Sequence, residues 1–146
     1  MAEEIKKETL TLVKEDGWAE VRMHINKSNS YDLKYYQELN WAIDEIRFDS
    51  SLKAAILMSD MPKFFSAGAD INFLRAADPH YKTQFCLFCN ETLDKMARSP
   101  QIWIACLEGH TVGGGLEMAL GCDLRFAGDG DFKIGLPEIT LGVLAG

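Results

Sequence analysis

A run of three glycines, Gly113 to Gly115, follows an apolar stretch and leads into a segment whose first turn carries Glu117. Glycine costs backbone entropy and has no side chain to pack, so three together indicate that the backbone comes close to something. Where a strand leads into a helix, such glycines present free backbone N–H groups with the positive end of the helix dipole behind them. That arrangement suits an oxygen that gains negative charge. The alternative is a tight strand-to-helix crossing with no ligand.

Two glutamates could act on a proton or a water molecule. Glu117 follows the glycines, and Glu138 lies among Leu136, Pro137 and Ile139, where a carboxylate has little reason to be unless something needs it. If the fold brings the two carboxyls together between apolar walls, one can serve as acid and the other as base near pH 7. In the alternative interpretation Glu117 only favours the helix N-terminus and Glu138 lies in a solvated loop, and sequence spacing does not decide between them.

Other kinds of site have weaker support. The glycine run lacks the lysine of a phosphate-binding loop, and Met118 occupies the last glycine position of a dinucleotide fingerprint. Residues 128–132, GDGDF, lack the later acidic positions of a calcium loop. The pair in CLFC could be half of a metal or redox site, but no second pair is evident, so no metal site is predicted. In a reducing compartment all four cysteines are expected to be buried free thiols, namely Cys86, Cys89, Cys106 and Cys122.

Length and composition favour one soluble domain. The chain has 146 residues, of which 47% are hydrophobic and 25% charged, so a single domain over residues 1–146 is expected. A net charge of −7 argues against nucleic-acid and anionic-membrane partners, which call for a basic face. No stretch has the pattern of a secretory signal, and no apolar run approaches the ~20 residues that span a bilayer, so a cytoplasmic location is expected.

Alternating strands and helices are expected to position the chemical groups. The expected strands cover residues 9–13 and 18–25, which form a hairpin, and 52–58, 102–108, 123–128 and 131–135. The expected helices cover residues 31–48, capped near Ser30 or Asp32, and 71–76, 79–98 and 114–121. Continuously apolar strands between helices indicate an α/β fold with a largely parallel sheet. Ligands bind such sheets beyond the carboxyl ends of the strands, where the glycine-containing loops 64–70 and 108–115 are expected to lie.

Three motifs, in this order, closely resemble the enoyl-CoA hydratase branch of the enoyl-CoA hydratase/isomerase (crotonase) superfamily. They are FFSAGADI (64–71), GHTVGGGLEMALGCDLRFAG (109–128) and FKIGLPEITLG (132–142). The similarity spans essentially the whole chain, although residues 25–33 depart from the family's asparagine-arginine-proline loop. The resemblance implies a crotonase-like spiral of repeated β-β-α units. It also implies that residues 1–146 are an N-terminal portion, which ends before a helical region used for trimerisation.

The resemblance also implies roles for particular residues. The backbone N–H groups of Ala69 and Gly114 would form an oxyanion hole for the thioester oxygen. Glu117 and Glu138 would hold and activate water at the β-carbon and exchange a proton at the α-carbon. The implied contacts to coenzyme A are Ala67, Gly68, Asp70, Ile71, Lys27 and Lys63. The implied contacts to the acyl group are Leu74, Gly113, Leu136 and Pro137.

The expected reaction is therefore reversible syn addition of water to a trans-2-enoyl-CoA. Coenzyme A would enter as part of the substrate, with no covalently bound cofactor, and the family's trimer or hexamer implies a homo-oligomer. The alternatives are an enoyl-CoA isomerase, another acyl-CoA enzyme of the family, or a truncated chain that binds acyl-CoA without turnover. A chain that stops at residue 146 is also expected to expose apolar surface and to self-associate.

Overall fold

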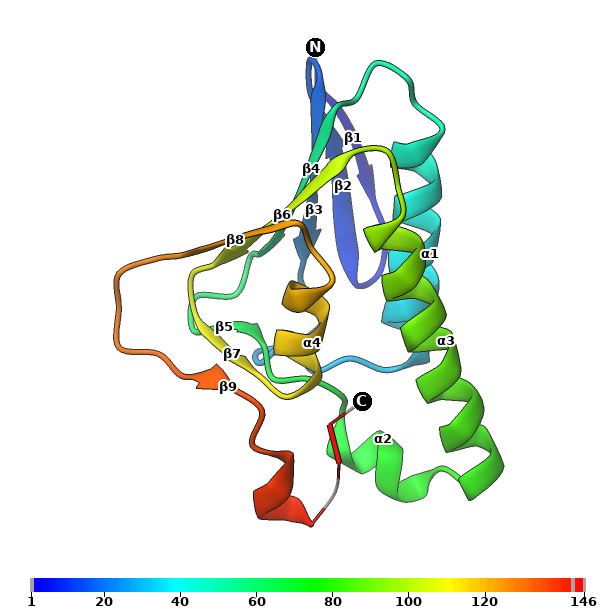
Figure 1. Ribbon diagram of the computed structural model, residues 1–146, viewed down its shortest axis with the longest axis vertical. Helices are drawn as coiled ribbons and strands as arrows, with labels where there is room; N and C mark the ends of the chain where they lie inside the picture. Colours follow the sequence, from blue (N-terminus) through cyan, green and yellow to red (C-terminus); the bar gives the residue numbers. More distant parts are fainter. Residues whose placement is uncertain (1, 143, 146) are drawn as a thin grey trace.

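The strands form two sheets in a computed structural model, which describes residues 2–142 and 144–145. Residues 1, 143 and 146 lie outside the described residues, and these include both ends of the expected domain. A six-stranded sheet has the order β1-β2-β3-β4-β6-β8, and a three-stranded sheet has the order β5-β7-β9 (Figure 1). The larger sheet consists of β1 (Glu3–Lys6), β2 (Leu10–Lys14), β3 (Trp18–Met23), β4 (Ala54–Ser59), β6 (Ile102–Leu107) and β8 (Leu124–Ala127). The smaller sheet consists of β5 (Phe64–Ser66), β7 (His110–Val112) and β9 (Ile134–Gly135).

Aspartates cap three of the helices. They are α1 (Leu33–Arg47), α2 (Ile71–Ala76), α3 (Pro79–Ala97), α4 (Gly114–Leu120) and a 3₁₀ helix, η1 (Glu138–Leu141). Asp32, Asp70 and Asp78 precede α1, α2 and α3, and each carboxylate accepts a hydrogen bond from a backbone N–H of the first turn. Pro79 then occupies the first turn of α3, where its missing N–H costs nothing.

The chain repeats one unit along the two sheets. A strand of the larger sheet leads to a short strand of the smaller sheet and then to a helix, as in β4-β5-α2-α3, β6-β7-α4 and β8-β9-η1. The first unit follows the same order, because Tyr31 makes an isolated parallel bridge to Ala69 between β3 and α1. From β3 onward the pairings are parallel, whereas β1, β2 and β3 pair antiparallel. The expected α/β fold of repeated β-β-α units is confirmed.

The core lies between the larger sheet and the helices α1 and α3, which run side by side (Figure 1). Its largest fully buried side chains include Trp103, Leu57, Tyr35, Tyr36, Leu39 and Ile43. The indole N–H of Trp103 donates to Ser99 Oγ at 2.7 Å, so the one polar atom of this large side chain is satisfied. None of the helices formed by the described residues has the length and apolar character needed to cross a bilayer.

Several elements differ from the sequence-based expectations. The strands β1, β5 and β7 and the helix η1 were not expected, and the strand expected at residues 131–135 is limited to β9. Strands as short as β5 and β7 carry too few residues to show an alternating pattern. The expectation of four buried thiols is wrong: Cys86 is exposed and Cys89 and Cys106 are partly buried, whereas Cys122 is buried. Cys86 and Cys89 line a cavity, and Cys89 also packs against the edge of the core.

The core assignment predicts unequal costs for two leucine truncations. Leu57, in the central strand β4, is 0% exposed, and Leu57→Ala is expected to lower the free energy of unfolding by about 2–5 kcal/mol. Leu87 on α3 is 49% exposed, so Leu87→Ala is expected to change it by less than about 0.5 kcal/mol. Urea unfolding followed by circular dichroism measures both, and equal losses would contradict this assignment.

Candidate active site

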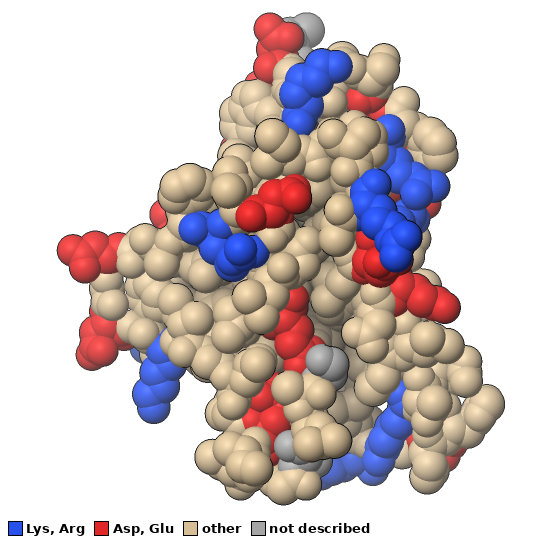
Figure 2. All heavy atoms as spheres, in the orientation of Figure 1, with Lys and Arg blue, Asp and Glu red and all other residues tan. Residues whose placement is uncertain are grey.

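A cavity of about 250 Å³ lies where the loops after β5 and β7 meet α3, α4 and η1. Its wall combines small apolar residues with a few polar groups. The lining residues are Tyr31, Ala67, Ala69, Ile71, Leu74, Phe85, Cys86, Cys89, Asn90, Gly113, Gly114, Glu117, Pro137, Glu138, Leu141 and Leu144. Figure 2 shows acidic side chains gathered in the recess between α4 and the C-terminal segment.

Each of the three consecutive glycines makes a close approach that a side chain would prevent. Gly113 has φ +58°, and a Cβ there would lie 2.9 Å from Glu138 Oε1. A Cβ on Gly114 would overlap the Tyr31 hydroxyl, and one on Gly115 would overlap the carbonyl of Ser66 in β5. Glycine is therefore favoured at Gly113 by its positive φ, at Gly114 by the buried Tyr31 side chain and at Gly115 by the backbone of β5.

The loops after β5 and β7 touch, and two backbone N–H groups lie between them. Gly68 has φ +85°, and a Cβ there would lie 2.8 Å from the backbone nitrogen of Gly114. The N–H groups of Gly68, Asp70 and Gly113 donate to acceptors within the chain. Within the described residues, the backbone N–H groups of Ala69 and Gly114 donate to no acceptor. Both residues line the cavity. Two such donors can bind an oxygen on which negative charge develops.

The two predicted glutamates reach the same cavity from different units of the fold. Glu117 lies in the first turn of α4, and Glu138 begins η1. Glu138 Oε2 is buried and has no hydrogen-bond partner among the described residues. A carboxylate oxygen kept from water without a partner is costly, which is typical of a group that binds a ligand. The cavity thus combines two carboxyls with the N–H groups of Ala69 and Gly114, so it could polarise a carbonyl and transfer protons nearby.

Most of the predicted site residues lie at this cavity. Of those predicted, the cavity is lined by Ala67, Ala69, Ile71, Leu74, Gly113, Gly114, Glu117, Pro137 and Glu138. Gly68 lies behind the wall against Gly114, and Asp70 caps α2 by accepting from Asn72 and Phe73. The predicted residues Lys27, Lys63 and Leu136 are not among the described residues that line it.

The cavity wall also contains residues that the sequence analysis did not predict. They are Tyr31, Phe85, Cys86, Cys89, Asn90, Leu141 and Leu144. Phe85 and Cys89 are four residues apart on α3, a spacing that indicates a shared helix face but not whether the face meets the core or a cavity. Burial raises the pKa of the Cys89 thiol well above its ordinary value, and the neighbouring Cys86 and Glu117 act in the same sense. Cys89 is therefore a neutral thiol in the wall at neutral pH.

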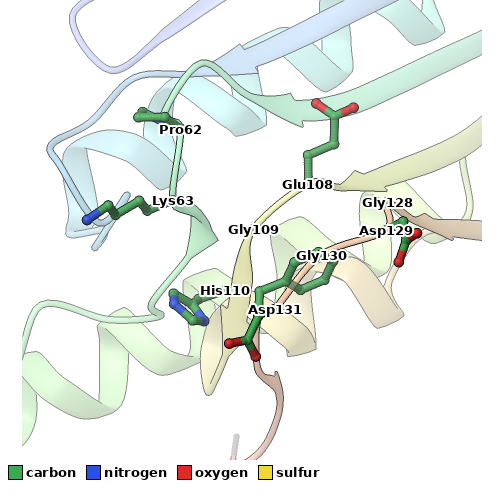
Figure 3. A pocket seen from close by; sticks show the side chains of 10 residues that line it. Pro62, Lys63, Glu108, Gly109, His110, Gly128, Asp129, Gly130 and Asp131 are labelled. Carbon is green, nitrogen blue, oxygen red and sulfur yellow. The ribbon is translucent and has the colours of Figure 1, made fainter.

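A wider, more open hollow of about 580 Å³ lies at the turns that lead from the larger sheet to the smaller one (Figure 3). It is lined by Pro62, Lys63, Glu108, Gly109, His110 and residues 128–132. His110 Nδ1 accepts from the backbone N–H of Lys133 at 2.9 Å, which gives this ring a local structural role. In the described part of the chain no three histidine, cysteine, aspartate or glutamate residues are placed to hold a metal. The smaller cavity is therefore the better candidate site, because it is lined by both carboxyls and by Ala69 and Gly114, whose N–H groups can bind an oxygen.

Comparisons with known proteins agree on one family. The family model described as enoyl-CoA hydratase/isomerase matches residues 14–146. A benzoyl-CoA-dihydrodiol lyase of Aromatoleum evansii is 38% identical over 146 residues, which cover 94% of this chain and 26% of that protein. A probable enoyl-CoA hydratase of Bacillus subtilis is 30% identical over 129 residues, which cover 88% of this chain and 49% of that protein. The chain thus spans half or less of the length of these relatives.

Solved structures share the fold. The crystal structure of an enoyl-CoA hydratase from Geobacillus kaustophilus superposes with a TM-score of 0.97 at 74% identity, over 99% of this chain and 55% of that one. An enoyl-CoA hydratase from Thermoplasma volcanium superposes with a TM-score of 0.86 at 28% identity, over 95% of this chain and 55% of that one.

The contact between Gly114 and Tyr31 predicts the sign of a stability change. Helix propensity alone would make Gly114→Ala stabilising, whereas overlap with the Tyr31 hydroxyl is expected to lower the free energy of unfolding by about 1–3 kcal/mol. Gly135→Ala is the matched control, because nothing lies within 4 Å of a Cβ at that position. Thermal and urea unfolding measure both variants, and a stabilised Gly114→Ala would overturn the close packing described above.

Proposed function

The chain belongs to the enoyl-CoA hydratase/isomerase family, and we propose that it adds water reversibly to a trans-2-enoyl-CoA thioester. One observation carries this proposal: Glu117, Glu138 and the N–H groups of Ala69 and Gly114 meet at one cavity. An oxyanion hole alone would serve several reactions of an acyl-CoA. The presence of two carboxyls favours hydration, because one can take a proton from water while the other exchanges a proton with carbon.

In the proposed reaction the thioester oxygen accepts hydrogen bonds from Ala69 and Gly114. The two glutamates hold a water molecule beside the β-carbon. One carboxylate takes a proton from this water while the water oxygen bonds to the β-carbon. The electron pair of the double bond moves toward the thioester, and the resulting enolate oxygen is stabilised by the two N–H groups, each worth about 3–4 kcal/mol in comparable sites. Delivery of a proton to the α-carbon completes the addition. The product then carries the hydroxyl of water on the β-carbon and a proton on the α-carbon.

Coenzyme A is proposed as the carrier of the acyl group. The backbone from Ala67 to Ile71 would face its pantetheine and adenine parts, since Ala67, Ala69 and Ile71 line the cavity. Lys27 is in an exposed loop and Lys63 borders the hollow in Figure 3, so either lysine would contact only a phosphate that reaches beyond the cavity. Leu74 and Pro137 would contact the acyl group, with Leu136 farther out. The homo-oligomer expected from the family stays a prediction.

A second candidate is a lyase that acts on a ring-bearing acyl-CoA. The rings of Tyr31 and Phe85 both line the cavity, and their centroids lie 6.4 Å apart. Flat aromatic walls accommodate a flat ring, and one relative is named a benzoyl-CoA-dihydrodiol lyase. Turnover of a ring-bearing acyl-CoA without hydration of a straight-chain enoyl-CoA would favour this candidate. Conversion of a 3-enoyl-CoA without hydration would instead favour an isomerase.

The proposal predicts the loss of hydration when either carboxyl is removed. Glu117→Gln and Glu138→Gln are each expected to lower kcat by at least about a hundredfold, because an amide cannot exchange the proton. The measurement is the loss of enoyl-thioester absorbance with crotonyl-CoA. Glu91→Gln, an exposed change on α3, is the matched control and is expected to retain activity.

Two outcomes would reject hydration by this pair. Undiminished turnover in either glutamine variant would exclude that carboxyl from the chemistry. Acyl-CoA binding without any turnover by the unchanged chain would favour a binding function instead.

A further inference from the structure

Tyr31 links the two loops that carry the N–H groups of Ala69 and Gly114. Its backbone N–H donates to the Gly68 carbonyl at 3.0 Å, and its carbonyl accepts from Asp70 N–H at 2.8 Å. These two bonds flank Ala69 in the first loop. The Tyr31 hydroxyl reaches the second loop, where it occupies the space that a Cβ on Gly114 would need.

The Tyr31 hydroxyl lies at Gly114, one turn before Glu117 on α4. Residues three apart on a helix share a face, and each side chain leans toward the helix N-terminus. The Glu117 side chain therefore leans over Gly114, which is three residues before it in α4. Tyr31 and Glu117 both line the cavity, and the charge of Glu117 is among the causes that raise the Tyr31 pKa, after burial and Cys89.

The surroundings of Tyr31 fix the position of its ring and keep its hydroxyl protonated. The ring packs edge-on against Tyr36, with centroids 4.9 Å apart, and the residue is only 4% exposed. Burial raises the pKa of Tyr31 well above its ordinary value, so its hydroxyl is protonated at neutral pH. Because Tyr31 keeps its proton at neutral pH, its hydroxyl can donate that proton in a hydrogen bond to a carboxylate.

We propose that the Tyr31 hydroxyl donates a hydrogen bond to the Glu117 carboxylate and fixes its orientation in the cavity. Tyr31 is then a positioning residue, and its importance for turnover rests on the proposed function of Glu117. The other ionisable groups that line the cavity are Glu138 on η1 and the thiols of Cys86 and Cys89 on α3. A carboxylate has lone pairs for several donors, so this bond is compatible with further partners of Glu117.

A spectroscopic test of the bond needs no turnover. In the full chain labelled with ¹³C at the glutamate carboxyl carbon, the Glu117 signal is identified by its loss in Glu117→Gln. Tyr31→Phe keeps the ring and removes only the hydroxyl, and we expect it to move that signal. Tyr35→Phe is the matched control, because it removes another buried hydroxyl that contacts α4, at Met118 Sδ. An unchanged Glu117 signal in Tyr31→Phe, or an equal shift in both variants, would overturn the proposal.

A double-mutant cycle tests the consequence for the reaction. Tyr31→Phe is expected to lower kcat for crotonyl-CoA about ten- to a hundredfold with little change in KM, since a hydrogen bond to a charged group is lost. In a Glu117→Gln background the same change is expected to have no further effect on kcat. An additive loss would overturn the positioning role. Absence of turnover in the unchanged chain would reject the proposed function, whereas the carboxyl signal would still decide whether the bond exists.

Discussion

The site depends on one steric condition: two loops from different units must touch backbone to backbone. Gly68 in the first loop meets the backbone nitrogen of Gly114 in the second at a distance that leaves no room for a Cβ. A Cβ on Gly68 would block this contact, and the conformation of Gly68, with φ +85°, favours glycine for a separate reason. Glycine at position 114 is instead favoured by the Tyr31 side chain, which fills the space that a Cβ would need. The contact brings the N–H groups of Ala69 and Gly114 to one cavity, so two fixed donors arise without any polar side chain.

The repeated unit of the fold explains why such distant segments converge. Each unit sends its short strand into the smaller sheet, so the loops that follow these strands collect at one edge. Parallel pairing of β5 with β7, and of β7 with β9, then sets the loops in fixed register. Successive units contribute different groups to the cavity: Tyr31 from the first, Ala69 from the second, Glu117 from the third and Glu138 from the fourth. The site is therefore a product of the repeat, with one contribution from each unit.

The sequence predicts what local chemistry decides and misses what distant contacts decide. The starts of α2 and α3 follow from Asp70, Asp78 and Pro79, because a cap acts on its own first turn. The two glutamates could be singled out because a carboxyl among apolar neighbours is unusual. Tyr31 could not, because its importance comes from a contact with Gly114, 83 residues away, and a tyrosine before a helix has no distinctive pattern. The strands β5 and β7 were not predicted for the same reason, because pairing with a partner strand, and not their own residues, defines them.

The two glutamates lie on elements that are stabilised to very different degrees. Glu117 stands on a helix that packs against β5 and β7, whereas Glu138 follows β9, a strand of two residues joined to β7 through hydrogen bonds from Thr111 and Gly113. Sub-global opening takes the least stabilised segments first, and residues 128–142 are largely exposed. On warming, amide protons of this segment should exchange with solvent well before those of β4 or α1. Heat would then separate the two carboxyls while the rest of the chain is still folded, so the site would be lost before the helical signal.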